Sequence, residues 1–220
     1  MPRSDVPDAS AFVPERPTLK RLRESAADCR GCGLWQDATQ TVFGEGLKRA
    51  RIMMVGEMPG DREDLAGRPF VGPAGRELDR ALEAVGIDRR DAYVTNVVKH
   101  FKFTPRGKRR IHQRPKQQEI TACYPWLEAE LAQVRPDALI LLGSTAAKAL
   151  LGSGFTLSRH RGELLDSPLA PIVTATVHPS SIIRSPDDES RHLARRDFTE
   201  DLRVVAEAVA VKSRQARQAA

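Results

Sequence analysis

From Ile52 to Gly60 the sequence reads Ile-Met-Met-Val-Gly-Glu-Met-Pro-Gly. The apolar run at its start predicts a buried strand, and the two glycines and the proline predict a tight turn after it. Glu57 lies in the middle of that turn. A carboxylate on a stiff, partly shielded turn is a candidate base or charge stabiliser. Because Gly-rich turns after strands are common, an incidental solvated glutamate is the competing interpretation.

Three more apolar runs predict strands, at residues 93–98, 137–142 and 172–177. Helical patterns lie before, between and after the strands, at residues 18–28, 73–86, 116–134, 145–151 and 190–211. Strands that alternate with helices pair in parallel, and strands that are apolar throughout are buried on both faces. We therefore predict an α/β three-layer sandwich, in which helices flank a central four-stranded parallel sheet. We expect Pro125 to break or kink its helix and Ser144 to cap the next one.

The length of 220 residues and the apolar content of 40% suit one domain. We expect a flexible arm at residues 1–17, a single domain at 18–211 and a basic tail at 212–220. The chain has no apolar run long enough to span a membrane, and its first residues lack the apolar stretch of a signal peptide. We expect a cytoplasmic monomer without membrane association.

Polar residues follow each predicted strand. Glu57 follows the first, Asn96 the second, Gly143 and Ser144 the third, and His178 the fourth. In open α/β sheets ligands bind at the carboxyl ends of the strands. We therefore expect these four signals to meet at one edge of the sheet, although His178 alone is more typical of a structural histidine.

The positive charge is concentrated in one segment. The net charge is +6, and residues 99–116 carry eight lysines and arginines and no acidic residue. Cations neutralise phosphates and aromatic rings stack on bases, so this segment predicts nucleic-acid binding, and a flexible solvated loop is the alternative. Within it, His112 is expected to be uncharged among the cations and to act as a nucleophile or base.

Three cysteines form the second candidate site. Cys29 and Cys32 have CxxC spacing, and Cys123 is the third thiol. Thiolates suit zinc or an iron–sulfur cluster, whereas a surface CxxC turn and an unrelated buried thiol are the alternative. A site closed by protein alone needs a fourth ligand, and His160 is the candidate that we would test first.

Five motifs together resemble the iron–sulfur uracil-DNA glycosylases: residues 56–60 (GEMPG), 70–75 (FVGPAG), 95–96 (TN), 142–144 (LGS) and 178–181 (HPSS). The resemblance runs from about Cys29 to about Leu202. The insert at residues 108–112 (KRRIH) is similar to the UdgX subgroup, whose members stay covalently attached to DNA after they remove uracil. Met58 departs from the glutamine usual in that subgroup, and the fourth cysteine of most relatives is absent.

The resemblance implies a role for each residue. Glu57 would activate a nucleophile at the sugar C1′, His112 would be that nucleophile, and His178 would stabilise the departing uracil anion. The uracil and DNA contacts would come from Gly56, Met58, Gly60, Asp61, Phe70, Asn96, Lys99, Arg110, Ser180 and Arg184. Cys29, Cys32 and Cys123 would hold a structural 4Fe-4S cluster.

The expected partner is uracil-containing DNA, with single strands preferred because flipping a base out of a strand costs least there. The expected reaction ends in a covalent bond between His112 and the abasic sugar. A conventional, turning-over uracil-DNA glycosylase is the first alternative. A non-catalytic, cluster-bearing nucleic-acid-binding protein is the alternative of another class.

Overall fold

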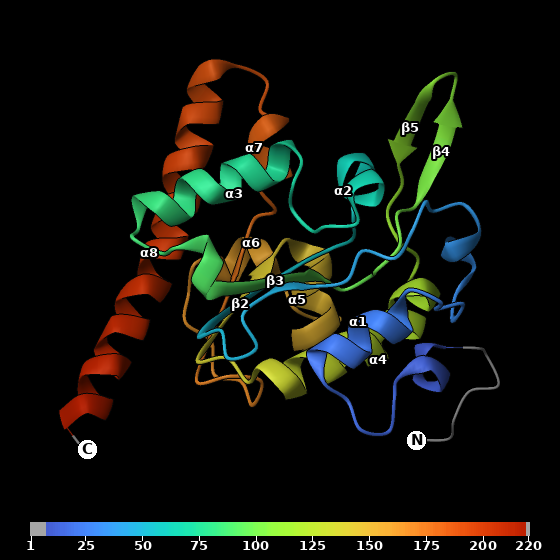
Figure 1. Ribbon diagram of the computed structural model, residues 1–220. Helices are drawn as coiled ribbons and strands as arrows, with labels where there is room; N and C mark the ends of the chain where they lie inside the picture. The colour runs from blue at the N-terminus through green and yellow to red at the C-terminus, as the bar shows by residue number, and fades with distance from the viewer. Residues whose placement is uncertain (1–7, 219–220) are drawn as a thin grey trace.

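The computed structural model describes residues 8–218, and its centre is a five-stranded sheet (Figure 1). The strand order is β1-β3-β2-β6-β7. The strands are β1 (Glu45–Gly46), β2 (Ile52–Gly56), β3 (Ala92–Asn96), β6 (Ala138–Leu142) and β7 (Ile172–Thr176). All neighbours pair in parallel except β1, which runs antiparallel to β3 at the edge. The predicted four-stranded parallel sheet is confirmed, and the two-residue β1 is an addition too short for a sequence pattern to indicate.

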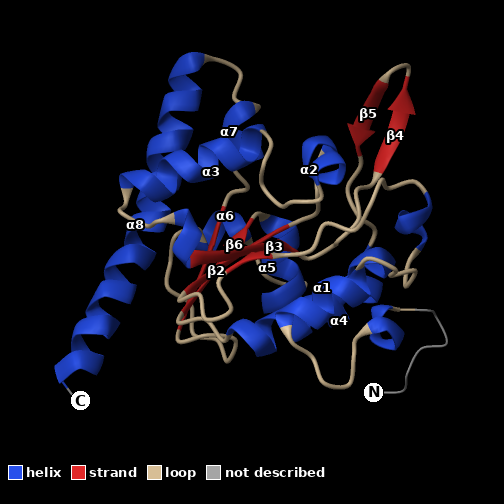
Figure 2. Ribbon diagram, in the orientation of Figure 1, coloured by secondary structure: helices blue, strands red, loops and turns tan. Residues whose placement is uncertain are grey.

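Helices cover both faces of the sheet (Figure 2). One face packs against α3 (Pro73–Ala84) and α8 (Asp188–Gln218), and the other against α1 (Leu19–Ala26), α4 (Gln117–Val134) and α5 (Ser144–Leu151). Successive side chains of a strand point to opposite faces. Met53 and Val55 of β2 therefore enter the core with α4, and Met54 enters the core with α3 and α8. Among residues 8–218, no helix is both long and apolar enough to cross a membrane.

Short elements complete the chain. They are the 3₁₀ turns η1 (Ala9–Phe12), η2 (Gly33–Gln36) and η3 (Arg89–Asp91), and the helices α2 (Asp61–Ala66), α6 (Leu157–His160) and α7 (Ser180–Ile183). Strands β4 (Phe103–Arg106) and β5 (Arg109–His112) form a separate antiparallel hairpin. The hairpin projects from the body of the protein beside α2 (Figure 1). The predicted insert is thus a paired element, with Gly107 in the left-handed conformation at its turn.

The structure contradicts one prediction about helices and part of another. Helix α4 runs through Pro125 without the predicted break, so Cys123 lies inside a continuous helix. A proline inside a helix costs about 3 kcal/mol, and full burial of Trp126 and Leu127 beside it contributes about 1.5–3 kcal/mol each. Ser144 is the first residue of α5 and makes no capping bond, because Gly143 is the N-cap.

The two ends of the chain also differ from the prediction. Helix α8 continues to Gln218, and its last turns are anchored because Lys212 pairs with Asp137 at 2.6 Å. The predicted tail at 212–220 is therefore helical as far as residue 218. At the other end residues 1–7 of the predicted arm lie outside the described residues. Residues 9–12 form η1, which packs against α4 with Ala9 fully buried, so this part of the arm is not loose.

Candidate active site

A pocket of about 750 Å³ opens at the carboxyl edge of the parallel sheet. Each parallel strand contributes to its wall: Glu57 follows β2, Asn96 ends β3, Gly143 follows β6 and His178 follows β7. The structure therefore brings together the four signals that the sequence places after its strands. The other predicted residues that line the pocket are Met58, Gly60, Asp61, Phe70, His112, Ser180 and Arg184.

The pocket lies where the order of the strands reverses. From β2 the chain crosses to β3 on one side, and β6 later pairs with β2 on the other side. The loops after β2 and β6 therefore diverge and leave a crevice, the usual binding place in such sheets. Gly143 in this crevice has φ of 96°, and a Cβ there would lie 3.0 Å from the Cβ of His178. Glycine is thus required for the close approach of His178.

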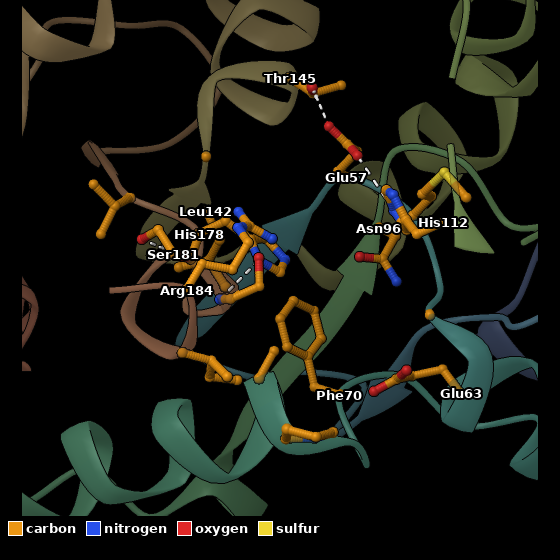
Figure 3. Close-up of a pocket in the computed structure, with 18 of the residues that line it drawn as sticks. Glu57, Glu63, Phe70, Asn96, His112, Leu142, Thr145, His178, Ser181 and Arg184 are labelled. Atoms are coloured by element: carbon orange, nitrogen blue, oxygen red, sulfur yellow. Dashed lines mark hydrogen bonds and ion pairs between the residues drawn. The ribbon is translucent and has the colours of Figure 1, made fainter. Parts of the chain in front are cut away.

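Glu57 is held by contacts on both carboxylate oxygens (Figure 3). The hydroxyl of Thr145, at the start of α5, donates a hydrogen bond to Oε2. Oε1 lies 3.5 Å from Nε2 of His112, the last residue of β5. The turn itself is fixed because the backbone N–H of Val98 donates to the Glu57 carbonyl at 3.0 Å. A carboxylate in this position can accept a proton or stabilise a positive charge.

The surroundings of His112 favour its neutral form. Its side chain is 46% exposed, but desolvation of the ring is the largest cause that lowers its pKa from the ordinary value. Glu57 opposes this shift, and the charges of Arg184 and Arg114 add to it. From the surrounding cations alone, the sequence predicts a neutral ring. The lowered pKa agrees with this prediction, but desolvation rather than the cations is its largest cause. A neutral imidazole has a free lone pair and can act as a nucleophile.

Phe70 and His178 form an aromatic surface inside the pocket. Their ring centroids lie 5.7 Å apart with an interplanar angle of 29°. Phe70 is buried and has φ of 55°, a strained conformation for an aromatic residue. The absence of a side chain at Gly75 permits it, because a Cβ there would lie 1.8 Å from the Phe70 carbonyl oxygen. A planar ring presented in this way suits stacking on a nucleobase.

Asn96 presents a polar atom without a partner. Its side chain is buried, and Oδ1 has no hydrogen bond among the described residues. Gly56 lies against it, since a Cβ on Gly56 would meet Oδ1 at 2.4 Å and Phe70 at 2.6 Å. An unpaired buried acceptor costs about 1–3 kcal/mol, so an N–H donor of a ligand would relieve that cost.

His178 is fixed as a neutral donor. The backbone N–H of Ser180 donates to Nδ1 at 3.2 Å, and the Ser180 hydroxyl lies 2.8 Å from the same nitrogen. The proton of the neutral ring is therefore on Nε2. Burial lowers the pKa of His178 to about 4, with Arg184 and His112 as further causes. The ring can donate one hydrogen bond into the pocket at neutral pH without carrying charge.

Two predicted DNA contacts are placed elsewhere. Lys99 is fully buried, with Nζ 2.5 Å from Glu130 Oε2, so it does not face a DNA strand. Arg110 pairs with Asp61 and Asp64 of α2 at 2.6 Å each and holds the hairpin against that helix. Exposed cations of the hairpin segment remain for phosphate contacts, at Arg106, Lys108, Arg109 and Arg114.

The three cysteines share one apolar core. Cys29 and Cys123 are buried and Cys32 packs at their edge. Trp126 Nε1 donates to Cys29 and the Lys99 N–H donates to Cys123, both at 3.2 Å. Burial raises the pKa of Cys123 to about 12. In the part of the chain that the structure describes, no three His, Cys, Asp or Glu residues are arranged to hold a single metal ion.

The predicted fourth ligand, His160, lies on the surface. Its side chain on α6 is 47% exposed, and its Nδ1 lies 2.9 Å from Glu163 Oε2. None of the contacts described for His160 joins it to a cysteine. A different imidazole, His100, follows Lys99 directly and is buried, with Nε2 2.9 Å from the Thr41 hydroxyl. His100 is not among the predicted site residues, although it follows shortly after the end of β3.

The comparisons agree with this geometry. A family model for the uracil DNA glycosylase superfamily matches residues 43–203. The type-4 uracil-DNA glycosylase of Thermotoga maritima is 37% identical over 181 residues, 82% of this chain and 91% of the relative. That of Sulfurisphaera tokodaii is 35% identical over 189 residues, 82% of each chain. A type-5 uracil-DNA glycosylase of Pyrobaculum aerophilum is 30% identical over 187 residues, 76% of this chain and 77% of the relative. The chain therefore belongs to the uracil DNA glycosylase superfamily, with type-4 enzymes among its relatives.

Proposed function

We propose that this protein is a uracil-DNA glycosylase that excises uracil and then binds the abasic sugar covalently through His112. The excision is supported by the relatives, which are named type-4 uracil-DNA glycosylases. The covalent step is supported by one observation above all, the approach of His112 Nε2 to within 3.5 Å of Glu57 Oε1. A neutral nucleophile and a carboxylate base meet there in the pocket.

The pocket suits the charges of N-glycosidic cleavage. The electron pair of the C1′–N1 bond leaves with uracil, so the sugar becomes positive and the base negative. Glu57 stabilises the sugar, and the Nε2–H of His178 donates to O2 of the departing anion. Phe70 stacks on the extruded base and Asn96 binds its polar edge, which satisfies the amide oxygen that lacks a partner.

The sugar cation is then captured by His112. Nε2 of His112 forms the bond to C1′ while Glu57 Oε1, which faces that nitrogen, takes the Nε2 proton, so the ring is left neutral with its lone pair on Nδ1. Water performs this step in a conventional, turning-over enzyme, which is the alternative outcome. Single-stranded substrate is preferred because extrusion of the base costs a few kcal/mol, and least where no base pair must be broken.

A denaturing gel tests the proposal. A labelled single strand with one uracil is mixed with protein and heated in detergent. We expect a band shifted by the mass of the protein, abolished in His112→Ala and weakened in Glu57→Gln. His192→Ala, which removes an exposed imidazole of α8, is the matched control and should crosslink fully.

The other outcomes of this gel contradict the proposal in different ways. Free abasic product beyond one equivalent would show conventional turnover. Intact DNA would favour a non-catalytic binding protein. Crosslinking at the wild-type level by His112→Ala would identify another nucleophile.

We further propose that Cys29, Cys32 and Cys123 hold a 4Fe-4S cluster. The donor set fits, since the three thiols pack in one apolar cluster and two of them, Cys29 and Cys123, receive N–H donors of the kind that stabilise thiolates. We propose His100 as the fourth ligand, because it is buried and follows Lys99, whose backbone N–H donates to Cys123. The bound cluster would fix the fold around the cysteines.

Metal analysis tests the cluster. We expect brown protein with about four irons per chain, which is the content of the proposed cluster. Iron content should fall in Cys123→Ser and in His100→Ala, and stay unchanged in the surface control His160→Ala. Colourless, zinc-loaded protein would contradict the cluster, and a loss of iron in His160→Ala would favour His160 as ligand.

A further inference from the structure

We propose that Thr145 is a positioning residue of this site, whose hydroxyl holds one oxygen of Glu57 so that the other faces His112 and the sugar. This inference rests on the proposed function, because it concerns the same carboxylate. Thr145 lines the same pocket as Glu57 and His112. It acts only through Glu57, to which its hydroxyl donates.

The contact joins the two sides of the crevice. Glu57 follows β2, and Thr145 belongs to the first turn of α5, which follows β6. The two strands are neighbours at the point where the strand order reverses. In Figure 3 the carboxylate of Glu57 lies between Thr145 on one side and His112 on the other. The hydroxyl occupies Oε2 and leaves Oε1 to His112.

Without this bond the carboxylate would have other partners. A glutamate side chain has several rotatable bonds, and the same pocket is lined by Arg62, Arg114 and Arg184. An ion pair with any of these guanidinium groups would turn the carboxylate away from the sugar. A charge stabiliser must be in place before the charge develops, so a displaced Glu57 would slow the cleavage step.

Thr145 is itself held firmly. The next two residues of α5, Ala146 and Ala147, are fully buried against the sheet. At the start of the helix the N–H of Gly143 donates to the carbonyl of Thr176 in β7 at 2.8 Å. The hydroxyl is therefore attached to a rigid part of the core. Rigid support of this kind is what a reacting group requires.

The rate of excision tests the role of Thr145. Thr145→Val keeps the shape and removes the hydroxyl, and Thr145→Ser keeps the hydroxyl. We expect Thr145→Val to slow single-turnover uracil excision and crosslinking by about tenfold to a hundredfold, the loss typical of a hydrogen bond to a charged group. The half-saturating protein concentration should not change, and Thr145→Ser should restore most of the rate. Thr121→Val, at an exposed site of α4, is the control for the substitution.

A second measurement needs no DNA. Glu57 raises the pKa of His112 only while the carboxylate is held beside the ring, and Arg114, Arg184 and His178 face the same ring. NMR titration should therefore give a lower pKa for His112 in Thr145→Val than in the wild type. An unchanged pKa together with an unchanged rate would overturn the inference and leave the proposed function intact. If the wild type left uracil-containing DNA untouched, the proposed function would fail, and the titration would still decide whether Thr145 holds Glu57.

Discussion

At the scale of single residues, the chemistry of the site depends on histidines that stay uncharged. Burial lowers the pKa of both His112 and His178. The consequence differs with the role. In the proposed mechanism a neutral His112 can attack C1′, whereas a neutral His178 keeps one N–H to donate to the leaving base. The same physical cause thus supplies a nucleophile and a hydrogen-bond donor.

His178 should make the fold sensitive to acid. Its pKa is about 4 in the folded protein, below the value near 6.5 of an unfolded chain. As the pH falls from about 6.5 to 4 the unfolded chain therefore takes up the proton first, and stability decreases. We expect the free energy of unfolding to fall by about 1–2 kcal/mol less in His178→Asn than in the wild type, a figure reduced for partial exposure of the ring. Urea unfolding at pH 7 and pH 4.5 measures this fall in both proteins. An equal fall in the two would contradict the prediction.

Residue positions were predictable where a strand ends in a polar group. Glu57, Asn96 and His178 follow apolar runs, so periodicity alone places them at one edge. The prediction that Lys99 contacts DNA was wrong because its burial depends on a distant part of the chain. Its partner Glu130 is 31 positions away in the chain, and the sequence pattern gives no sign that the two meet. Thr145 was missed because a hydroxyl in a first helical turn is commonly a capping group.

At the scale of elements, the hairpin β4–β5 carries His112, the nucleophile of the proposed mechanism. Residues in alternate positions share a face, so Arg110 and His112 point to the same side of β5. Arg110 pairs with two aspartates of α2, and its guanidinium lies over Phe101 and Phe103 at 5.3 Å and 5.1 Å. Through these contacts α2 fixes the orientation of the hairpin and therefore of His112.

Loss of Arg110 should affect crosslinking more than excision. Arg110→Ala removes two ion pairs and frees the hairpin, so His112 leaves its place while Glu57 and His178 stay. We expect crosslinking of bound DNA to slow about tenfold or more and free abasic product to appear, since a misplaced group of this kind loses up to about a hundredfold. Rapid-quench single turnovers measure both products.

The neighbouring Arg109 provides a control for the hairpin. Arg109→Ala removes an exposed cation of the same strand, so it should weaken DNA capture and lower the salt dependence of binding without changing the ratio of the products. If Arg110→Ala kept that ratio as well, the hairpin would not depend on its contacts with α2. The sequence predicted the charge of this segment but not its fold, because the acidic partners lie far back in the chain.

At the scale of the whole molecule, Lys99 and Glu130 connect the cysteines to the pocket. The Lys99 N–H donates to Cys123, and its Nζ donates to the carbonyl of Asn96 at 2.6 Å. Glu130 of α4 accepts from Tyr93 and Thr95 of β3. Helix α4 is thereby joined to strand β3, which ends at Asn96, the residue proposed to bind the base. Both side chains are completely buried.

This buried pair should respond strongly to the loss of one partner. Glu130→Gln leaves the Lys99 ammonium uncompensated in the core, and we expect a loss of about 3–5 kcal/mol in the free energy of unfolding. Lys99→Met with Glu130→Leu removes both charges and should recover part of that loss, because apolar pairs often replace buried ion pairs at little cost. Urea denaturation of Lys99→Met, Glu130→Leu and the double variant measures the coupling. A loss below about 1 kcal/mol in Glu130→Gln, the range of a surface pair, would mean that the pair does not join the two parts of the molecule.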